Sequence, residues 1–64
     1  MNVGHNIRRI RKARGITQER LAEETGISQA MLCQVEKGLK NPSLLVSAEM
    51  AKILGCRIED FLKD

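Results

Sequence analysis

The stretch from Gln18 to Lys37 constrains the fold of this chain more than any other part of the sequence. Gly26 stands near its middle, where a residue without a Cβ lets the backbone turn sharply. Ala22 is small, as expected where a second helix passes close by, and apolar residues recur at helical spacing on both sides of the turn. The pattern predicts two short helices that cross steeply over a tight turn. Its members are Leu21, Ala22, Gly26, Ile27, Leu32 and Val35.

The rest of the sequence divides into further short helices. Apolar residues recur with helical periodicity, and a glycine follows most of the segments. Thr17, Ser28 and Ser43 stand where N-cap residues belong. The sequence predicts helices at about 3–14, 18–25, 29–37, 44–54 and 57–62. Because the sequence has neither internal repeats nor β-type alternation, we expect an all-α chain that forms a single domain over residues 1–64.

The short length of the chain limits its stability. A domain of 64 residues buries only roughly 60% of the surface that its unfolded form exposes. One Phe is the only aromatic residue, so the core must be aliphatic. We therefore expect marginal stability that pairing with a second copy would raise. The presence of only one aromatic side chain also argues against single-stranded nucleic acid as the main ligand, because such sites stack bases on aromatic rings.

Positive charge is concentrated at one end of the chain. Residues 1–16 contain five Arg or Lys and no acidic residue, whereas residues 43–64 are slightly acidic. This distribution suits a polyanion that meets the N-terminal part. The two Cys are far apart and there is one His, which does not give the closely spaced ligands of a zinc site. We expect no metal and no other cofactor.

Features of enzymes and of membrane proteins are not found in the sequence. A Ser or Cys nucleophile grouped with His and an acid, or a phosphate-binding glycine loop, would indicate catalysis, and neither is present. No apolar run approaches the roughly 20 residues of a membrane span, and we see no signal peptide. We expect a cytoplasmic protein with reduced thiols that is not an enzyme and has no contact with a membrane.

The third predicted helix leaves a characteristic face free once its apolar side is buried. Ile27, Leu32 and Val35 hold this helix on the core, and the opposite face carries small, polar or basic side chains. A face of this kind suits the major groove of double-stranded DNA. Its residues are Ser28, Gln29, Ala30, Cys33, Gln34 and Lys37.

With these features the chain resembles the Cro/repressor helix-turn-helix (XRE) family. The resemblance covers nearly the whole chain, in the segments IRRIRKARGITQERLAEETGIS, QVEKGLKNPSL and MAKILGCRIEDFL. It implies a compact five-helix, lambda-repressor-like domain with the helix-turn-helix at its second and third helices. Members are typically transcriptional regulators that bind inverted-repeat operators as homodimers. We therefore expect a sequence-specific regulator of transcription, and specifically a repressor.

The resemblance also implies which residues contact DNA. Gln bonds bidentately to adenine, and the methyl group of Ala can touch that of thymine. Base contacts are implied for Ser28, Gln29, Ala30, Cys33 and Gln34. Contacts to the DNA backbone, which set the register, are implied for Arg11, Thr17, Gln18, Lys37, Lys40 and Asn41.

Arg11 and Glu36 have a second implied role. In the family, an Arg of the first helix commonly pairs with the Glu of an I/V-E-x-G sequence, which here is Val35–Glu36–Lys37–Gly38. Such a pair, if bidentate and partly buried, would tie the two helices together and could direct the guanidinium at a phosphate. The alternative is two solvated charges.

Two apolar groups near the C-terminus have alternative interpretations. Leu45 and Val46 either pack in the core through a shifted helix register or form an exposed patch that contributes to self-association. Ile58, Phe61 and Leu62 either close the core of the monomer or contribute to a dimer interface. We name all five residues as candidates for that interface.

Two further functional alternatives remain at this point. Cys33 could act as an oxidation sensor, because a modified thiol on the DNA-facing surface would block binding. The chain could also be an antitoxin-type protein whose main role is to bind a partner protein while it regulates its own promoter. The Leu45–Val46 pair is the sequence feature that suggests this role.

Overall fold

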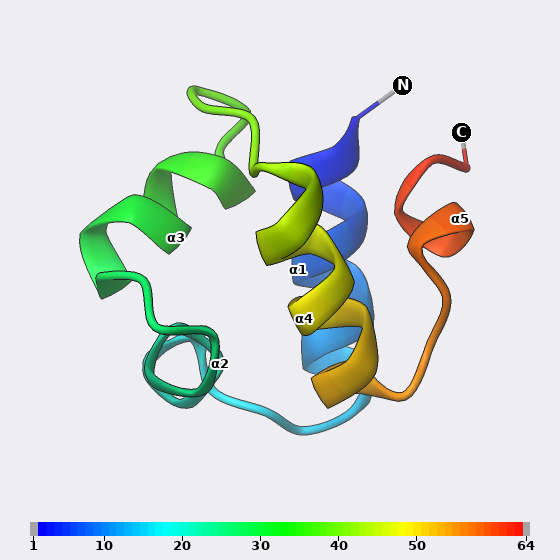
Figure 1. Cartoon of the computed structure of the whole chain (residues 1–64), viewed down its shortest axis with the longest axis horizontal. Helices are drawn as coiled ribbons and strands as arrows, with labels where there is room; N and C mark the ends of the chain where they lie inside the picture. The colour runs from blue at the N-terminus through cyan, green and yellow to red at the C-terminus, as the bar shows by residue number, and fades with distance from the viewer. Residues whose placement is uncertain (1, 64) are drawn as a thin grey trace.

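The structure is a computed structural model that describes residues 2–63. Its helices are α1 (Val3–Ala13), α2 (Gln18–Thr25), α3 (Gln29–Glu36), α4 (Leu44–Leu54) and α5 (Ile58–Phe61). Over this part of the chain no strand is present, so the prediction of an all-α, five-helix chain is confirmed. Figure 1 shows α2 and α3 together on one side of the molecule, α1 and α4 in the centre and α5 at the opposite side.

Short polar residues begin three of the helices, as the sequence predicts. The hydroxyl oxygens of Thr17, Ser28 and Ser43 accept backbone N–H groups three residues further on, at 3.1, 3.0 and 3.1 Å respectively. These bonds satisfy N–H groups that have no partner inside the helix. Several predicted helix ends are one residue too long, because the terminal residue is a cap. These caps are Arg14, Lys37, Arg57 and Leu62.

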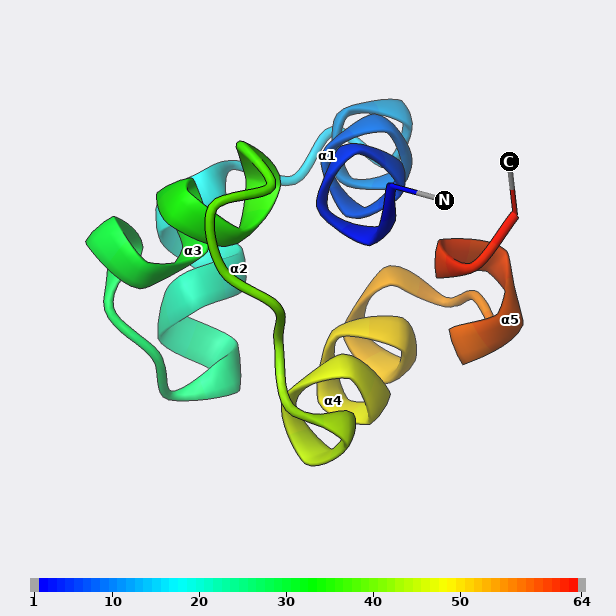
Figure 2. The same cartoon turned by 90° about the horizontal axis from the view of Figure 1, so that it is seen from above.

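The core lies between the helices and draws side chains from all five. Phe61, the sole aromatic residue, is fully buried and brings α5 onto the other helices. Seen from above, α1 lies between α3 and α5, and α4 lies below it (Figure 2). The largest fully buried side chains are Ile7, Leu21, Leu32, Val35, Met50, Leu54 and Phe61.

α1 and α3 approach each other unusually closely at Gly4. A Cβ added to Gly4 would lie 1.8 Å from the carbonyl oxygen of Val35 and 2.8 Å from its carbonyl carbon. No real side chain fits at that distance, so this contact requires glycine in the first turn of α1. The close approach brings the N-terminal part of α1 against the C-terminal end of α3.

Two polar side chains of α1 attach the C-terminal part of the chain. Asn6 is buried, and its Nδ2 donates to the carbonyl oxygens of Phe61 and Lys63 at 2.9 and 2.5 Å. Arg14 Nε donates to the carbonyl oxygen of Leu54 at 2.9 Å. The carbonyl groups of Leu54 and Phe61 are the last of α4 and α5, which helices leave without an internal partner.

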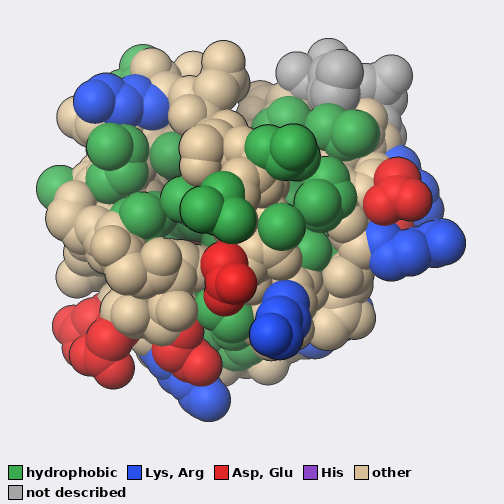
Figure 3. Space-filling model, in the orientation of Figure 1, with side chains coloured by type: hydrophobic (Ala, Val, Ile, Leu, Met, Phe, Trp, Pro, Cys, Tyr) green, Lys and Arg blue, Asp and Glu red, His purple; other side chains and the backbone are tan. Residues whose placement is uncertain are grey.

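Several large apolar side chains remain on the surface. Leu44 and Leu45, at the start of α4, are each 76% exposed, whereas Val46 is half-buried against the core. Leu45 is thus exposed, as the interpretation of this pair as a surface patch predicts. Val46 packs against the core, as the other interpretation predicts. Figure 3 shows hydrophobic side chains spread across the face that carries α4.

The apolar residues of α5 separate in the same way. Phe61 is fully buried in the monomer, so its side chain is not available to a partner chain, which corrects its place among the dimer-interface candidates. Ile58 is half-buried against the core, and Leu62 is 49% exposed.

Within residues 2–63, no helix combines the length and apolar character needed to cross a membrane. The described His, Cys, Asp and Glu residues form no group of three or more that could hold a metal ion.

Candidate nucleic-acid interface

α2 and α3 cross over a tight turn at Gly26. The φ angle of Gly26 is +76°, in the left-handed region that favours glycine. The backbone N–H of Ile27 then donates to the carbonyl oxygen of Ala22 at 3.1 Å, which closes the end of α2. Ala22 is itself buried, as expected for a residue where two helices pass close together. The chain thus turns between Thr25 and Ser28 and does not continue as one helix.

α3 is buried along one side and open along the other. Leu32 and Val35 are fully buried, and Ile27 packs against the same core from the preceding turn. The opposite side contains the residues that the sequence assigns to the DNA-facing surface. Of these, Cys33 is half-buried, and the exposed ones are Ser28, Gln29, Ala30, Gln34 and Lys37.

A buried ion pair joins α1 to the end of α3. Arg11 Nε and Nη2 donate to the two carboxylate oxygens of Glu36 at 2.7 and 3.0 Å, and Nη1 donates to the carbonyl oxygen of Ile16 at 2.9 Å. The two side chains are 8% and 2% exposed. The bidentate pair that the sequence suggests is thus present, and the alternative of two solvated charges is wrong.

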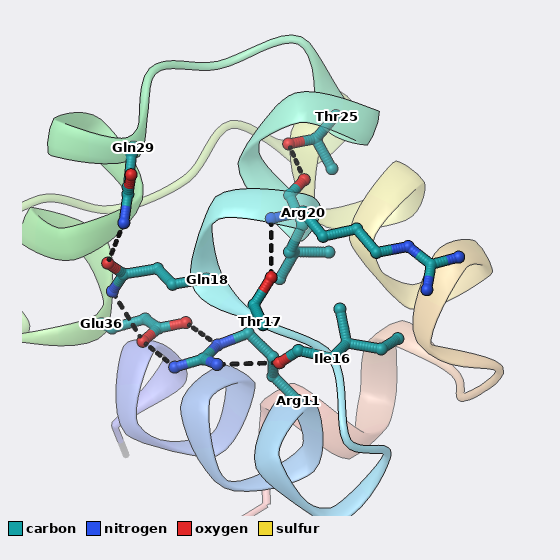
Figure 4. Close-up of polar contacts among 9 residues, drawn as sticks. Arg11, Ile16, Thr17, Gln18, Arg20, Thr25, Gln29 and Glu36 are labelled. Carbon is teal, nitrogen blue, oxygen red and sulfur yellow. Dashed lines mark hydrogen bonds and ion pairs between the residues drawn. The ribbon is translucent and has the colours of Figure 1, made fainter.

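Gln18, the first residue of α2, connects this pair to the start of α3. Its Nε2 donates to Glu36 Oε1 at 3.1 Å, and its Oε1 accepts from Gln29 Nε2 at 3.4 Å. Figure 4 shows the resulting series of contacts, which runs from α1 through the end of α3 to α2 and back to the first turn of α3. Gln29, which the sequence assigns to the DNA-facing surface, is therefore linked to a buried charge pair.

The candidate backbone-contacting residues differ in their exposure. Lys37, Lys40 and Asn41 are exposed in or just after the C-cap of α3. Thr17 is exposed and its hydroxyl caps α2. Arg11, in contrast, lies under the surface, with all three guanidinium nitrogens donating to groups of the protein. Arg11 is thus held mainly by groups of the protein, and its implied contact with the DNA backbone stays a prediction.

The sequence gives Arg8 no role of its own, because it is one of five Arg or Lys residues in the N-terminal part. In the structure it is exposed on α1 and borders the same hollow as Gln18, Cys33 and Lys37. The sequence signal that points to it is spacing, since Arg8 precedes Arg11 by three residues and so lies on the same side of the helix.

Two ionisable groups with shifted pKa values lie away from this surface, around α5. Burial raises the pKa of the Cys56 thiol, the charge of Asp60 raises it further, and Arg14 opposes both. A hydrogen bond from the backbone N–H of Arg57 lowers the pKa of Asp60, and Lys63 reinforces the effect. A raised pKa leaves the Cys56 thiol protonated and unreactive at neutral pH.

Comparison with known proteins gives a consistent result. A family model described as helix-turn-helix matches residues 7–61. The chain is 40% identical over 53 residues to an uncharacterized HTH-type transcriptional regulator of Sinorhizobium fredii, which covers 83% of this chain and 69% of the relative. It is also 40% identical over 58 residues to the immunity repressor protein of Bacillus phage phi105, covering 91% of this chain but only 40% of the repressor.

Solved structures agree with these sequence matches. The clp gene regulator ClgR from Corynebacterium glutamicum superposes with a TM-score of 0.91 and 31% identity, covering 95% of this chain and 65% of ClgR. The restriction-modification controller protein C.AhdI from Aeromonas hydrophila gives a TM-score of 0.86 and 30% identity, covering 94% of this chain and 91% of the controller. The chain thus spans less than two thirds of ClgR and of the phage repressor.

Proposed function

Because the chain belongs to the Cro/repressor-type (XRE) helix-turn-helix family of DNA-binding transcriptional regulators, we propose that it binds an inverted-repeat operator as a homodimer and represses transcription there. Regulators of this family are not enzymes, and the chain is accordingly not one. Because a regulator of transcription acts on chromosomal DNA, the proposal includes a cytoplasmic location.

In this proposal α3 is the recognition helix and enters the major groove. The observation that carries it is the two-sided character of α3, with Leu32 and Val35 fully buried and a row of small or polar side chains on the other side, all exposed except the half-buried Cys33. The row consists of Ser28, Gln29, Ala30, Cys33 and Gln34, and these are the proposed base-contacting residues.

Contacts to phosphates would hold α3 in register. The N-terminal end of α2, at Thr17 and Gln18, offers free N–H groups and the positive end of the helix dipole, both of which suit a phosphate. Lys37, Lys40 and Asn41 are exposed at the other end of the surface and would contact the backbone there. Base contacts between these two anchors give specificity.

Homodimer formation and repression have separate support. Leu44, Leu45 and Leu62 leave apolar surface exposed that a second copy would cover. A two-fold pair would place its recognition helices about 34 Å apart, one turn of the duplex. The relative from phage phi105 is an immunity repressor, which favours repression over activation.

The direct test is sequence preference at fixed salt. We would select bound duplexes from a library with a randomised core, then compare the affinity for the enriched duplex with that for a scrambled duplex of equal length and composition. The proposal predicts an inverted repeat and a preference of at least about 10³-fold. Equal affinities would overturn sequence specificity, and an enriched site without two-fold symmetry would overturn the homodimer.

A role in binding a partner protein is the second candidate, favoured by the exposure of Leu45. If that role were primary, the native protein would co-purify with a different chain in equal amounts. A homodimer alone, measured by light scattering of the native protein, would count against it.

A further inference from the structure

A cleft of about 450 Å³ lies between α1, the start of α2 and the end of α3. Arg8 lines it from α1, Gln18 from α2, and Cys33, Glu36 and Lys37 from α3 and its C-cap. Gln18, Cys33 and Lys37 also belong to the proposed DNA-contacting surface. The cleft therefore continues that surface onto α1.

The charge of the cleft is positive where it meets solvent. Glu36 is the one acidic residue in its lining, and its carboxylate accepts hydrogen bonds from Arg11 and Gln18. Arg8 and Lys37 are exposed, and neither forms an ion pair with an acidic side chain of residues 2–63. Two cations thus face an open cleft whose negative charge is already neutralised, which favours an anion.

We propose that Arg8, together with Lys37, binds one phosphate of the DNA backbone in this cleft. The proposal rests on the DNA binding proposed above. The paired N–H groups of a guanidinium match two oxygens of a phosphodiester, while the ammonium of Lys37 adds a point charge. Arg11 is only 7% exposed, and its Nε, Nη1 and Nη2 each already donate a hydrogen bond within the protein. Arg8 lies one helical turn before it, on the surface, and takes the role that the sequence assigns to Arg11.

Arg9 provides a matched control for Arg8. It is the next residue of α1, carries the same charge and is also exposed. It lines a different hollow, with Arg14, Cys56 and Asp60, on the α5 side of α1. Arg9→Ala therefore removes one positive charge from the same helix without altering the cleft.

The test compares the wild type with the Arg8→Ala, Arg8→Lys and Arg9→Ala variants. Affinity for the enriched duplex and for its scrambled version is measured at four chloride concentrations, and urea unfolding checks that each variant is folded. We expect Arg8→Ala to bind both duplexes about tenfold more weakly at low salt. It should also lower the slope of log affinity against log salt by about 0.9, the value for one phosphate contact. Arg8→Lys should keep the slope but lose part of the affinity, and Arg9→Ala should keep both close to the wild type.

The outcomes separate this inference from the function on which it rests. Equal losses for Arg8→Ala and Arg9→Ala would mean that Arg8 acts through net charge alone, and the inference would fail while DNA binding stood. A wild type without preference for the enriched duplex, combined with a lower slope for Arg8→Ala only, would retain the phosphate contact and reject sequence-specific recognition. A wild type that binds neither duplex would reject both. Repeating the titration in inorganic phosphate at equal ionic strength tests for a free-phosphate site, and binding of free phosphate that Arg8→Ala abolishes without any change in DNA affinity would overturn the assignment to DNA.

Discussion

Gln18 donates its side-chain amide N–H to Oε1 of Glu36 at 3.1 Å, and this bond sets the direction of the contacts beside α3. A carboxylate can only accept, so Gln18 must turn its amide oxygen the other way, toward Nε2 of Gln29. Gln29 is then left with its carbonyl oxygen and a second N–H free. These are the two groups that a bidentate contact with adenine requires. The orientation of Gln29, an exposed side chain that we propose contacts DNA, therefore depends on the buried pair of Arg11 and Glu36.

Removal of one partner from this buried pair should destabilise the domain strongly. We expect Arg11→Ala to lower the free energy of unfolding by about 3–5 kcal/mol, because the carboxylate of Glu36 remains buried without its main partner. Urea unfolding followed by far-UV circular dichroism at neutral pH and low temperature measures this loss. The control is Arg20→Ala, which breaks the exposed pair of Arg20 and Glu24 and should cost about 0–1 kcal/mol. Similar losses for the two variants would contradict the buried character of the pair.

Gly4→Ala should also destabilise the domain, although this substitution usually stabilises a helix by roughly 0.5–1 kcal/mol. The added Cβ would lie 1.8 Å from the carbonyl oxygen of Val35, so α1 would have to move away from α3. Gly15→Ala is the comparison, because its Cβ would meet nothing within 4 Å but its φ of +70° disfavours Ala by about 1 kcal/mol. In thermal unfolding, the midpoint temperature of Gly4→Ala should be well below that of Gly15→Ala. A Gly4→Ala protein as stable as the wild type would mean that the two helices are not in close contact.

The sequence predicts the helices well because the residues that start and end them act locally. Thr17, Ser28 and Ser43 each cap a helix through an N–H group three residues away, so a short stretch of sequence contains all the information. The same holds for the turn at Gly26 and for the buried and exposed sides of α3, which follow from helical periodicity.

The contacts that the sequence does not reveal join residues that are distant along the chain. Asn6 bonds to the carbonyl of Phe61, and Arg14 bonds to that of Leu54. Neither side chain differs in type from an ordinary surface residue, so only the packing of α1 against the C-terminal helices identifies them. Arg11 and Arg8 illustrate the same limit. Both are arginines on one side of α1. Arg11 is buried because it bonds to the buried carboxylate of Glu36, whereas Arg8 is exposed.

The stability of α5 should fall in acid through Asp60. The hydrogen bond from the backbone N–H of Arg57 at 3.0 Å, aided by Lys63, holds the pKa of Asp60 below its usual value in the folded chain. The unfolded chain therefore takes up this proton first, and the stabilisation is complete above the usual carboxyl pKa and is lost as the pH falls through the folded value. We expect an NMR titration of the Asp60 carboxyl to give a depressed pKa, and amide exchange in α5 to accelerate at that pH. In Asp60→Asn the acceleration should be absent, whereas an unshifted titration in the wild type would contradict the contact.

The apolar start of α4 should contribute to self-association. Leu44 and Leu45 are each 76% exposed, and burial of a leucine side chain contributes about 1.5–3 kcal/mol. We expect the double variant Leu44→Ser, Leu45→Ser to weaken the proposed homodimer at least about tenfold in sedimentation equilibrium. Leu39→Ser removes a similarly exposed leucine from the loop before α4 and should leave the dimer unchanged. Equal effects of the two changes would indicate non-specific hydrophobic association and not a defined interface.

Base readout and backbone contact should be separable by changing two exposed residues of the proposed DNA-facing surface, one in α3 and one in the loop after it. Gln34 lies on α3, and Lys40 lies in the loop that follows it. Gln34→Ala removes a side chain able to bond to a base, so it should cost about 1–3 kcal/mol on the enriched duplex and relax the base preference at one position, with the salt slope unchanged. Lys40→Ala removes a point charge, so it should weaken enriched and scrambled duplexes alike and lower the salt slope by about 1. Both are measured by fluorescence anisotropy over a range of salt concentrations. Because the two side chains are exposed, neither change should alter folding, and a reversal of the two results would mean that the groove-facing side of α3 is wrongly assigned.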